Sequence, residues 1–128
     1  MTKTTPRGEV TIQTLAMPAD TNANGDIFGG WLVSQMDLAA GVLSKKLSRG
    51  RTATIAIHSM TFLRPVHVGD MISCYAELIK TGNTSMTIAV EVWTEMLSTG
   101  EQFRVTEGTF VFVAIDDKGK PRPVSKSA

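Results

Sequence analysis

The chain has few cysteine and histidine residues, the types that most often form disulfides, bind metals or act in catalytic triads. Its 128 residues include one cysteine, Cys74, which has no partner for an internal disulfide and is typical of a reducing compartment. The two histidines, His58 and His67, have no cysteine or acidic residue at a spacing typical of zinc ligands or of a histidine-based triad. We therefore expect no metal site.

Features of nucleic-acid, membrane and nucleotide sites are also lacking. The net charge is +1 and no basic run exceeds Lys45-Lys46, which does not indicate a nucleic-acid or anionic membrane surface. No run of about eighteen apolar residues is present, and the first eight residues lack the apolar core of a secretion signal. The glycine motifs of phosphate-binding and dinucleotide sites are missing. These absences predict a cytoplasmic protein.

The composition that is present is typical of a globular domain, with 42% hydrophobic and 20% charged residues. The length predicts one domain over residues 1–128. We expect residues 1–8 and 125–128 to be flexible, because short polar ends are seldom fixed by the fold.

The most informative stretch runs from Ile27 to Leu43, seventeen residues with one formal charge, Asp37. Apolar residues recur there at helical spacing, which predicts a helix over residues 27–49. Leu38 and Val42 fall on the side opposite the apolar stripe, so we expect a helix that is buried nearly all round.

Glycines mark both ends of this helix. Gly50, after several basic residues, suits a left-handed cap at the end of the helix. Gly29 and Gly30 weaken the first turn by roughly 1 kcal/mol each relative to alanine, so they need another purpose. Bare N–H groups at a helix start can approach a ligand closely, and the helix dipole favours a developing oxyanion.

Asp37 has three possible roles: a helix-surface aspartate, a buried cap for a backbone N–H group, or a general base or nucleophile tuned by burial. Its apolar neighbours argue against the surface role and leave the buried cap and the catalytic role open. Gly29 precedes Asp37 by eight residues, or about 12 Å of helix rise, which is too far for both to reach one atom. We hypothesise a site in which an acyl group meets the glycine N–H of one subunit and the carboxylate of its mate.

Alternating apolar and polar residues predict five strands, at residues 9–17, 52–63, 71–80, 85–97 and 102–115, with the last four in antiparallel hairpins. Residues 18–26 form a loop, and a turn follows at residues 81–83. Within 85–97, one side should hold Met86, Ile88, Val90, Val92 and Met96, and the other Thr87, Glu91 and Glu95. One helix cannot cover such a sheet, so we expect a homodimer or a larger assembly.

Three stretches together resemble a known family: MPADTNANGDIFGGWLVSQMD from Met17, FLRPVHVGD from Phe62 and VEVW from Val90. They are similar to hotdog-fold acyl-CoA thioesterases of the bacterial YciA type, over about residues 9–124. The resemblance implies an α+β fold with one long helix wrapped by a five- to six-stranded antiparallel sheet. It implies dimers joined edge to edge, with shared active sites, commonly as a trimer of dimers. The implied reaction hydrolyses acyl-CoA to a carboxylic acid and CoA, without a metal or a separate cofactor.

The resemblance also assigns residues. It implies that Asp37 is the catalytic carboxylate, that Gly30 or Gly29 supplies the oxyanion N–H, and that Asn24 and Asn22 reach the site. By composition alone the two asparagines are equally turn formers. Phe28 stands where many relatives carry histidine, and His58 replaces a common acidic residue. Candidate partners for the CoA phosphates are Arg64, Lys80, Arg104 and the turn of Gly82, Asn83, Thr84 and Ser85.

Two other functions stay open. A hotdog hydratase or dehydratase normally needs a histidine paired with an acid, and neither histidine lies near the helix motif. A non-catalytic acyl-CoA-binding domain would not need Asp37. For the hydrolase itself two mechanisms are open: Asp37 activates a water molecule, or it attacks the thioester to form an anhydride.

Overall fold

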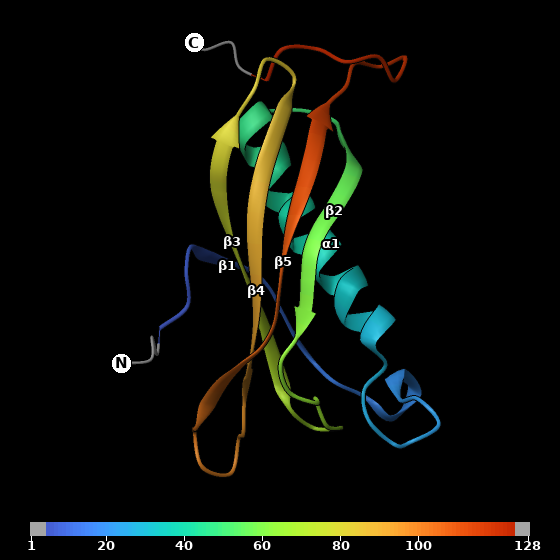
Figure 1. Cartoon of the computed structure of the whole chain (residues 1–128), viewed down its shortest axis with the longest axis vertical. Coiled ribbons are helices and arrows are strands. Elements are labelled where there is room, and N and C mark those ends of the chain that lie inside the picture. Colours follow the sequence, from blue (N-terminus) through green and yellow to red (C-terminus); the bar gives the residue numbers. More distant parts are fainter. Residues whose placement is uncertain (1–4, 125–128) are drawn as a thin grey trace.

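The computed structural model describes residues 5–124, in which one long α-helix packs against a five-stranded antiparallel sheet (Figure 1). The elements are β1 (Glu9–Leu15), the 3-10 helix η1 (Pro18–Asp20), α1 (Gly29–Ser48), β2 (Thr52–Phe62), β3 (Met71–Thr81), β4 (Ser85–Glu95) and β5 (Gln102–Ala114). The predicted α+β fold is confirmed. The expectation of flexible ends falls partly on residues 1–4 and 125–128, which lie outside the described residues.

The predicted elements are present, with small differences at their ends. The loop at residues 18–26 contains η1, which the sequence did not indicate. The left-handed residue at the end of α1 is Arg49, with φ of 60°, so the prediction of Gly50 as the cap is wrong. The N–H of Arg49 donates to the carbonyl of Lys45 at 2.8 Å. Gly50 instead lies against the guanidinium of Arg122, which also donates to the Ser48 carbonyl.

The strands lie in the order β1-β3-β4-β5-β2, and every neighbouring pair is antiparallel. The hairpins β3-β4 and β4-β5 are confirmed, but β2 pairs with β5 rather than with β3. The prediction of four consecutive hairpin strands is therefore wrong at its first step. Residues 63–70 join β2 to β3, a connection longer than a tight hairpin of about two to five residues. It carries the chain from one edge strand to the other half of the sheet.

The core lies between α1 and the inner face of the sheet. Met36, Ala39 and Ala40 of α1 are completely buried, and a Cβ atom on Gly41 would stand in van der Waals contact with the ring of Phe112, at 3.7 Å. The predicted inward side of β4 is confirmed for four residues, Met86, Ile88, Val90 and Val92, which are all buried. The fifth, Met96, follows the end of β4 and is exposed. Small side chains on α1 thus allow the helix to approach the central strands.

One side of α1 and the adjoining edge strand β2 leave apolar side chains exposed. In the single chain Leu38 is 56% exposed, and Val42 is exposed beside it, so the expectation of all-round burial is not met by one chain. Ile55, Ile57 and Phe62 of β2 are also exposed. Apolar side chains exposed on two neighbouring elements are typical of an interface.

Ile88→Ala tests whether the packing of β4 against α1 stabilises the fold. Ile88 is completely buried, so its truncation should lower the free energy of unfolding by about 2–5 kcal/mol. Ile88→Val, which removes one methylene, should cost only about 0.5–1.5 kcal/mol. Urea unfolding at several protein concentrations measures both, and an Ile88→Ala midpoint equal to that of the parent chain contradicts the packing described.

Candidate functional site

The start of α1 is fixed by hydrogen bonds from the preceding loop. The N–H of Phe28 donates to the carbonyl of Asp20 at 2.7 Å, and the N–H of Ile27 donates to the carbonyl of Val66 at 2.9 Å. The carbonyl of Phe28 then accepts from Trp31 at 3.0 Å. Within the described residues the N–H groups of Gly29 and Gly30 have no acceptor, and the positive end of the helix dipole coincides with them.

The glycine pair also makes room for an aromatic ring. A Cβ atom on Gly30 would stand 2.6 Å from the ring of Phe28, which is itself 55% exposed. A Cβ on Gly29 would only touch the ring of Phe62, at 3.6 Å. Glycine at position 30 thus permits Phe28 to lie over the first turn of the helix.

A groove of about 320 Å³ opens beside this helix start. Three candidate residues line it, Asn22, Gly29 and Arg64, together with Asp26, Ile27, Leu32, Phe62, Leu63, Pro65 and Val66. The Oδ1 atom of Asn22 accepts from the N–H groups of Asn24 (2.8 Å) and Asp26 (3.1 Å), so its side chain stabilises the turn. Asn24 is exposed on the same loop and does not line the groove.

Asp37 lies farther along α1, facing the edge strand β2. Its Oδ1 atom accepts a hydrogen bond of 2.7 Å from the hydroxyl of Thr54. The expectation of a buried carboxylate is not met in the single chain, because Asp37 is only half-buried there. The apolar helix side next to it, which includes Leu38, is exposed rather than covered by this chain's own sheet.

Asp37 lines a second groove, of about 390 Å³, between α1 and β2. The other lining residues are Leu38, Gly41, Val42, Lys45, Thr52, Ala53, Thr54 and Phe112. The wall is therefore mostly apolar, with a carboxylate, an ammonium group and two hydroxyls. The two grooves share no lining residue, so one chain does not bring Asp37 together with Gly29 or Asn22.

The remaining candidates are dispersed. The turn from Gly82 to Ser85 lies at the upper end of the sheet in Figure 1, far from the helix start, and the carbonyls of Asn83 and Thr84 accept from Val124 and Ala114. The guanidinium of Arg64 lies 3.8 Å from the centroid of the Phe103 ring. The other two cations lie away from both grooves: Lys80 is exposed and Arg104 pairs with Glu91 at 3.5 Å.

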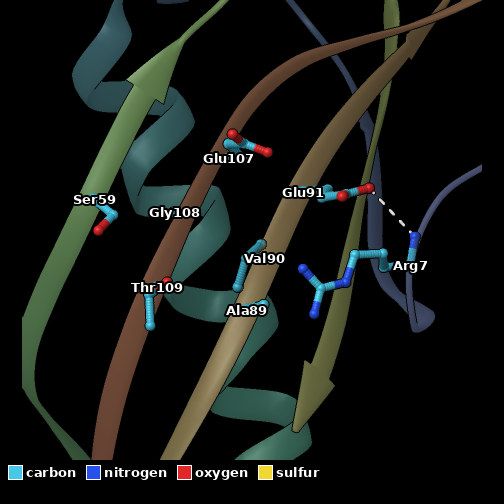
Figure 2. Close-up of a pocket in the computed structure, with 8 residues that line it drawn as sticks. All are labelled: Arg7, Ser59, Ala89, Val90, Glu91, Glu107, Gly108 and Thr109. Atoms are coloured by element: carbon cyan, nitrogen blue, oxygen red, sulfur yellow. Dashed lines mark hydrogen bonds between the residues drawn. The ribbon is translucent and has the colours of Figure 1, made fainter. Parts of the chain in front are cut away.

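A smaller cavity, of about 200 Å³, lies on the face of the sheet opposite α1 (Figure 2). Its lining includes Arg7, Ser59, Glu91 and Glu107, none of which the sequence marked as a site residue. Ser59 has φ of 54°, in an irregular stretch of β2. No signal in the sequence indicates this irregularity, because serine seldom adopts positive φ.

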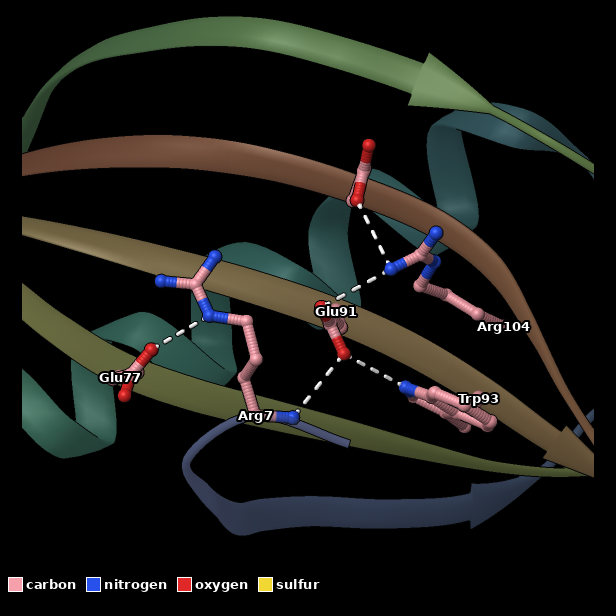
Figure 3. Close-up of polar contacts among 6 residues, drawn as sticks. Arg7, Glu77, Glu91, Trp93 and Arg104 are labelled. Carbon is pink, nitrogen blue, oxygen red and sulfur yellow. Dashed lines mark hydrogen bonds and ion pairs between the residues drawn. The ribbon is translucent and has the colours of Figure 1, made fainter. Parts of the chain in front are cut away.

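Glu91 is the buried centre of a polar cluster on this outer face (Figure 3). It lies on the predicted outward side of β4 yet is only 4% exposed. Its carboxylate accepts from the N–H of Arg7 at 3.3 Å and from the indole of Trp93 at 2.9 Å, and it pairs with Arg104. Arg7 also pairs with Glu77 at 2.7 Å, so the cluster fastens the N-terminal segment across β3 and β4. This arrangement is structural, since the carboxylate is already occupied.

The described residues hold no group of three or more histidine, cysteine, aspartate or glutamate side chains arranged to bind a metal ion. Likewise, no helix within residues 5–124 has the length and apolar character needed to cross a bilayer.

Comparison with known proteins shows which family has this fold. The chain belongs to the thioesterase superfamily, because the sequence model of that family matches residues 24–100. The chain is 53% identical over 123 residues to the acyl-CoA thioester hydrolase YciA of Salmonella typhimurium, covering 94% of this chain and 92% of the relative. The family resemblance predicted from the sequence is thereby confirmed.

Two solved structures are similar as well. The hexameric thioesterase of Yersinia pestis superposes with a TM-score of 0.91 at 53% identity, covering 95% of this chain and all (100%) of that one. The hexameric hotdog fold thioesterase of Campylobacter jejuni has a TM-score of 0.87 at 39% identity, covering 92% of this chain and 91% of that one.

Cys74 should be unreactive in the native protein. It is completely buried on β3, and burial raises the pKa of its thiol to about 12. At pH 8 only about one thiol in ten thousand is then ionised, and it is sheltered from solvent. A colorimetric thiol reagent should therefore react with about one equivalent in urea and with almost none in buffer. Rapid reaction of the native protein would contradict this burial.

Proposed function

We propose that this chain hydrolyses acyl-CoA thioesters to a carboxylic acid and CoA. The observation that carries the proposal is the arrangement of α1. Two glycine N–H groups at its start have no acceptor among the described residues, a carboxylate lies in its middle, and the chain is similar to acyl-CoA thioester hydrolases. The N–H groups would stabilise the oxyanion that forms from the thioester carbonyl. Asp37 would supply the base or the nucleophile.

The residues around the helix start have supporting roles in this proposal. Gly30 donates the oxyanion hydrogen bond, with Gly29 as the alternative donor. Asn24, exposed on the loop, contacts the substrate or its water, while Asn22 holds the loop in shape through its Oδ1 atom. The exposed ring of Phe28 offers an apolar surface beside the thioester.

For the CoA phosphates, Arg64 is the favoured partner. It lines the same groove as Gly29, and its guanidinium lies 3.8 Å from the centroid of the Phe103 ring. The turn of Gly82, Asn83, Thr84 and Ser85 is the second candidate. In one chain this turn is remote from the helix start, so it would have to serve a neighbouring subunit.

The active site is proposed to be shared between two subunits. Asp37 and Gly29 line separate grooves, and eight residues of helix separate them by about 12 Å. β2 is an edge strand, so its outer backbone groups have no partner strand in the described chain. Two-fold pairing of β2 edges would bring the two α1 helices together in opposite directions. The start of one helix would then approach Asp37 of the other.

Pairing at this edge also covers the exposed apolar residues of α1 and β2, which include Leu38 and Ile57. It would complete the burial of Asp37 that the single chain lacks. We propose the homodimer as the catalytic unit and a trimer of dimers as the full assembly, in line with the hexameric thioesterases of similar structure.

Asp37→Asn tests the catalytic assignment. The amide keeps the size of the side chain but is neither a base nor a nucleophile, so thiol release from acyl-CoA should fall by about 10²–10⁴-fold. CoA binding, measured by calorimetry, should be retained. Asp117→Asn is the matched control, since Asp117 is exposed on the loop after β5 and should keep the parent rate.

The same assay separates the rival functions. Unchanged release by Asp37→Asn contradicts the assignment of Asp37. Binding of acyl-CoA by the parent chain without any release indicates a binding domain, and hydration of an enoyl-CoA without thiol release indicates a hydratase.

Isotope labelling distinguishes the two mechanisms. In single-turnover hydrolysis in ¹⁸O-water, direct attack by Asp37 gives an anhydride, and water that opens it at the Asp37 carbonyl leaves label in the enzyme carboxylate, which rules out simple general-base catalysis. General-base catalysis places the label only in the released acid.

Ile55→Lys tests the shared site. Ile55 is exposed on β2, and a lysine there should oppose pairing of two β2 edges, so dimers should dissociate and activity should fall with them. Val10→Lys, an equivalent change on the opposite edge strand β1, should leave the dimer intact. Light scattering and thiol release measure both. A folded Ile55→Lys monomer with full activity would refute a shared site.

A further inference from the structure

The groove between α1 and β2 contains two opposite charges separated by an apolar wall. Asp37 and Lys45 are the first and the last residue of α1 that line it. The volume of about 390 Å³ falls within the usual range of small-molecule sites, about 300–1,000 Å³. The apolar lining comes from Leu38, Gly41 and Val42 on the helix and from Ala53 and Phe112 on the sheet.

A chain of hydrogen bonds holds Lys45 at the groove. Its Nζ atom donates to Oγ1 of Thr52 at 3.3 Å, and this oxygen lies 2.7 Å from the hydroxyl of Ser44. Ser44 is completely buried and donates its single hydroxyl hydrogen to the carbonyl of Gly41 at 2.9 Å, so Thr52 is the donor to Ser44. The ammonium of a flexible side chain is thereby tied to a buried part of the helix.

The Lys45 ammonium has no carboxylate partner among residues 5–124. Its neighbour Lys46, by contrast, pairs with Glu9 at 2.9 Å. Thr52 takes one of the three N–H donors of the Lys45 ammonium, and the side chain is exposed, so a ligand can reach the other two. A cation beside an apolar wall is suited to an anionic group on an apolar chain.

Two distances bound the separation between the Asp37 carboxylate and the Lys45 ammonium. Along α1 their Cα atoms are eight residues apart, or about 12 Å. On β2 the threonines that contact them, Thr54 and Thr52, are two residues apart, or about 7 Å. Side chains on a helix also lean toward its N-terminus, which brings the ammonium closer to Asp37. A ligand that joins the two groups therefore spans about 7–12 Å.

We propose that this groove accepts acyl chains that end in a carboxylate, with the thioester carbonyl at Asp37 and the terminal carboxylate at Lys45. The inference rests on the proposed hydrolase function and deepens it by naming a substrate class, the CoA monothioesters of dicarboxylic acids. An extended hydrocarbon chain advances about 1.3 Å per carbon, so a span of about 7–12 Å corresponds to about six to ten carbons. The apolar wall contacts the methylenes, and the ammonium donates charge-assisted hydrogen bonds to the tail.

The charge at Lys45, rather than the apolar wall, provides the selectivity. A chain of equal length that ends in a methyl group makes the same contacts with the wall but receives no hydrogen bond from the ammonium. The ratio of kcat/KM for the two chains therefore isolates the tail, because the CoA part and the thioester are identical in both.

Lys45→Gln is the direct test, with thiol release measured from octanoyl-CoA and from its counterpart with a terminal carboxylate. In the parent chain the two thioesters should have kcat/KM values within a few-fold of each other, because the ammonium offsets the cost of removing water from the tail. Lys45→Gln should lower the ratio of the carboxylate-ended to the methyl-ended thioester by about 10-fold. Lys45→Glu reverses the charge, so it should favour an eight-carbon chain that ends in an ammonium.

Chain length provides an internal check. A four-carbon chain that ends in a carboxylate is too short to reach Lys45 from Asp37, so Lys45→Gln should not change the ratio for the four-carbon pair.

Lys46→Gln is the matched control. It removes the same charge from the same turn of α1, but Lys46 pairs with Glu9 and lines neither groove. The parent ratio is expected for this variant. The comparison separates a contact with the tail from a general loss of positive charge near the polyanionic CoA.

Each outcome decides the matter. A parent-like ratio in Lys45→Gln overturns the proposal, while release of thiol from octanoyl-CoA still supports the hydrolase function. An equal loss for both thioesters also overturns it, because Lys45 then acts on the CoA part or on the fold, and so does an equal change of the ratio in Lys46→Gln. Absence of thiol release by the parent chain from both thioesters overturns the proposed function and the inference together.

Discussion

A continuous helix fixes the distance between the free N–H groups at its start and a carboxylate in its middle. In α1 eight residues separate Gly29 from Asp37, about 12 Å along the axis, and no bending within one chain brings them to the same atom. The structure accordingly gives each its own groove. In the proposed hydrolase, catalysis therefore depends on assembly, because the proposed site takes one of its two groups from a second helix.

The sheet makes that second helix accessible. Its order leaves β2 at an edge, and α1 lies beside that edge with an apolar side uncovered. The same surface therefore contains the outer edge of β2, the exposed helix side and the groove of Asp37. In the proposed dimer, a second copy would pair with the strand edge and bury the apolar side chains. It would also remove water from around the carboxylate, which a single chain leaves half-buried.

Periodicity predicted the elements well, because helix and strand spacing depend on which face meets the core. It identified α1, all five strands and the buried side of β4. Periodicity failed where contacts between residues far apart in the sequence determine the structure. The pairing of β2 with β5, the burial of Glu91 under Arg7 and the Thr54–Asp37 hydrogen bond each join residues that no local pattern connects. The roles of Asp37, Gly30 and Asn24 stay predictions, since they concern a substrate and a partner subunit.

Complementation between two inactive variants tests the shared site most directly. Asp37→Asn removes the carboxylate, and Gly30→Pro removes the N–H in the first helical turn and also displaces the Phe28 ring, which a Cβ at position 30 would approach to 2.6 Å. Co-expressed in equal amounts, they should form mixed dimers in which one of the two sites has both groups intact. Half the dimers are mixed and each has one working site of two, so about a quarter of the parent activity should return. Mixtures as inactive as the separate variants would contradict the account.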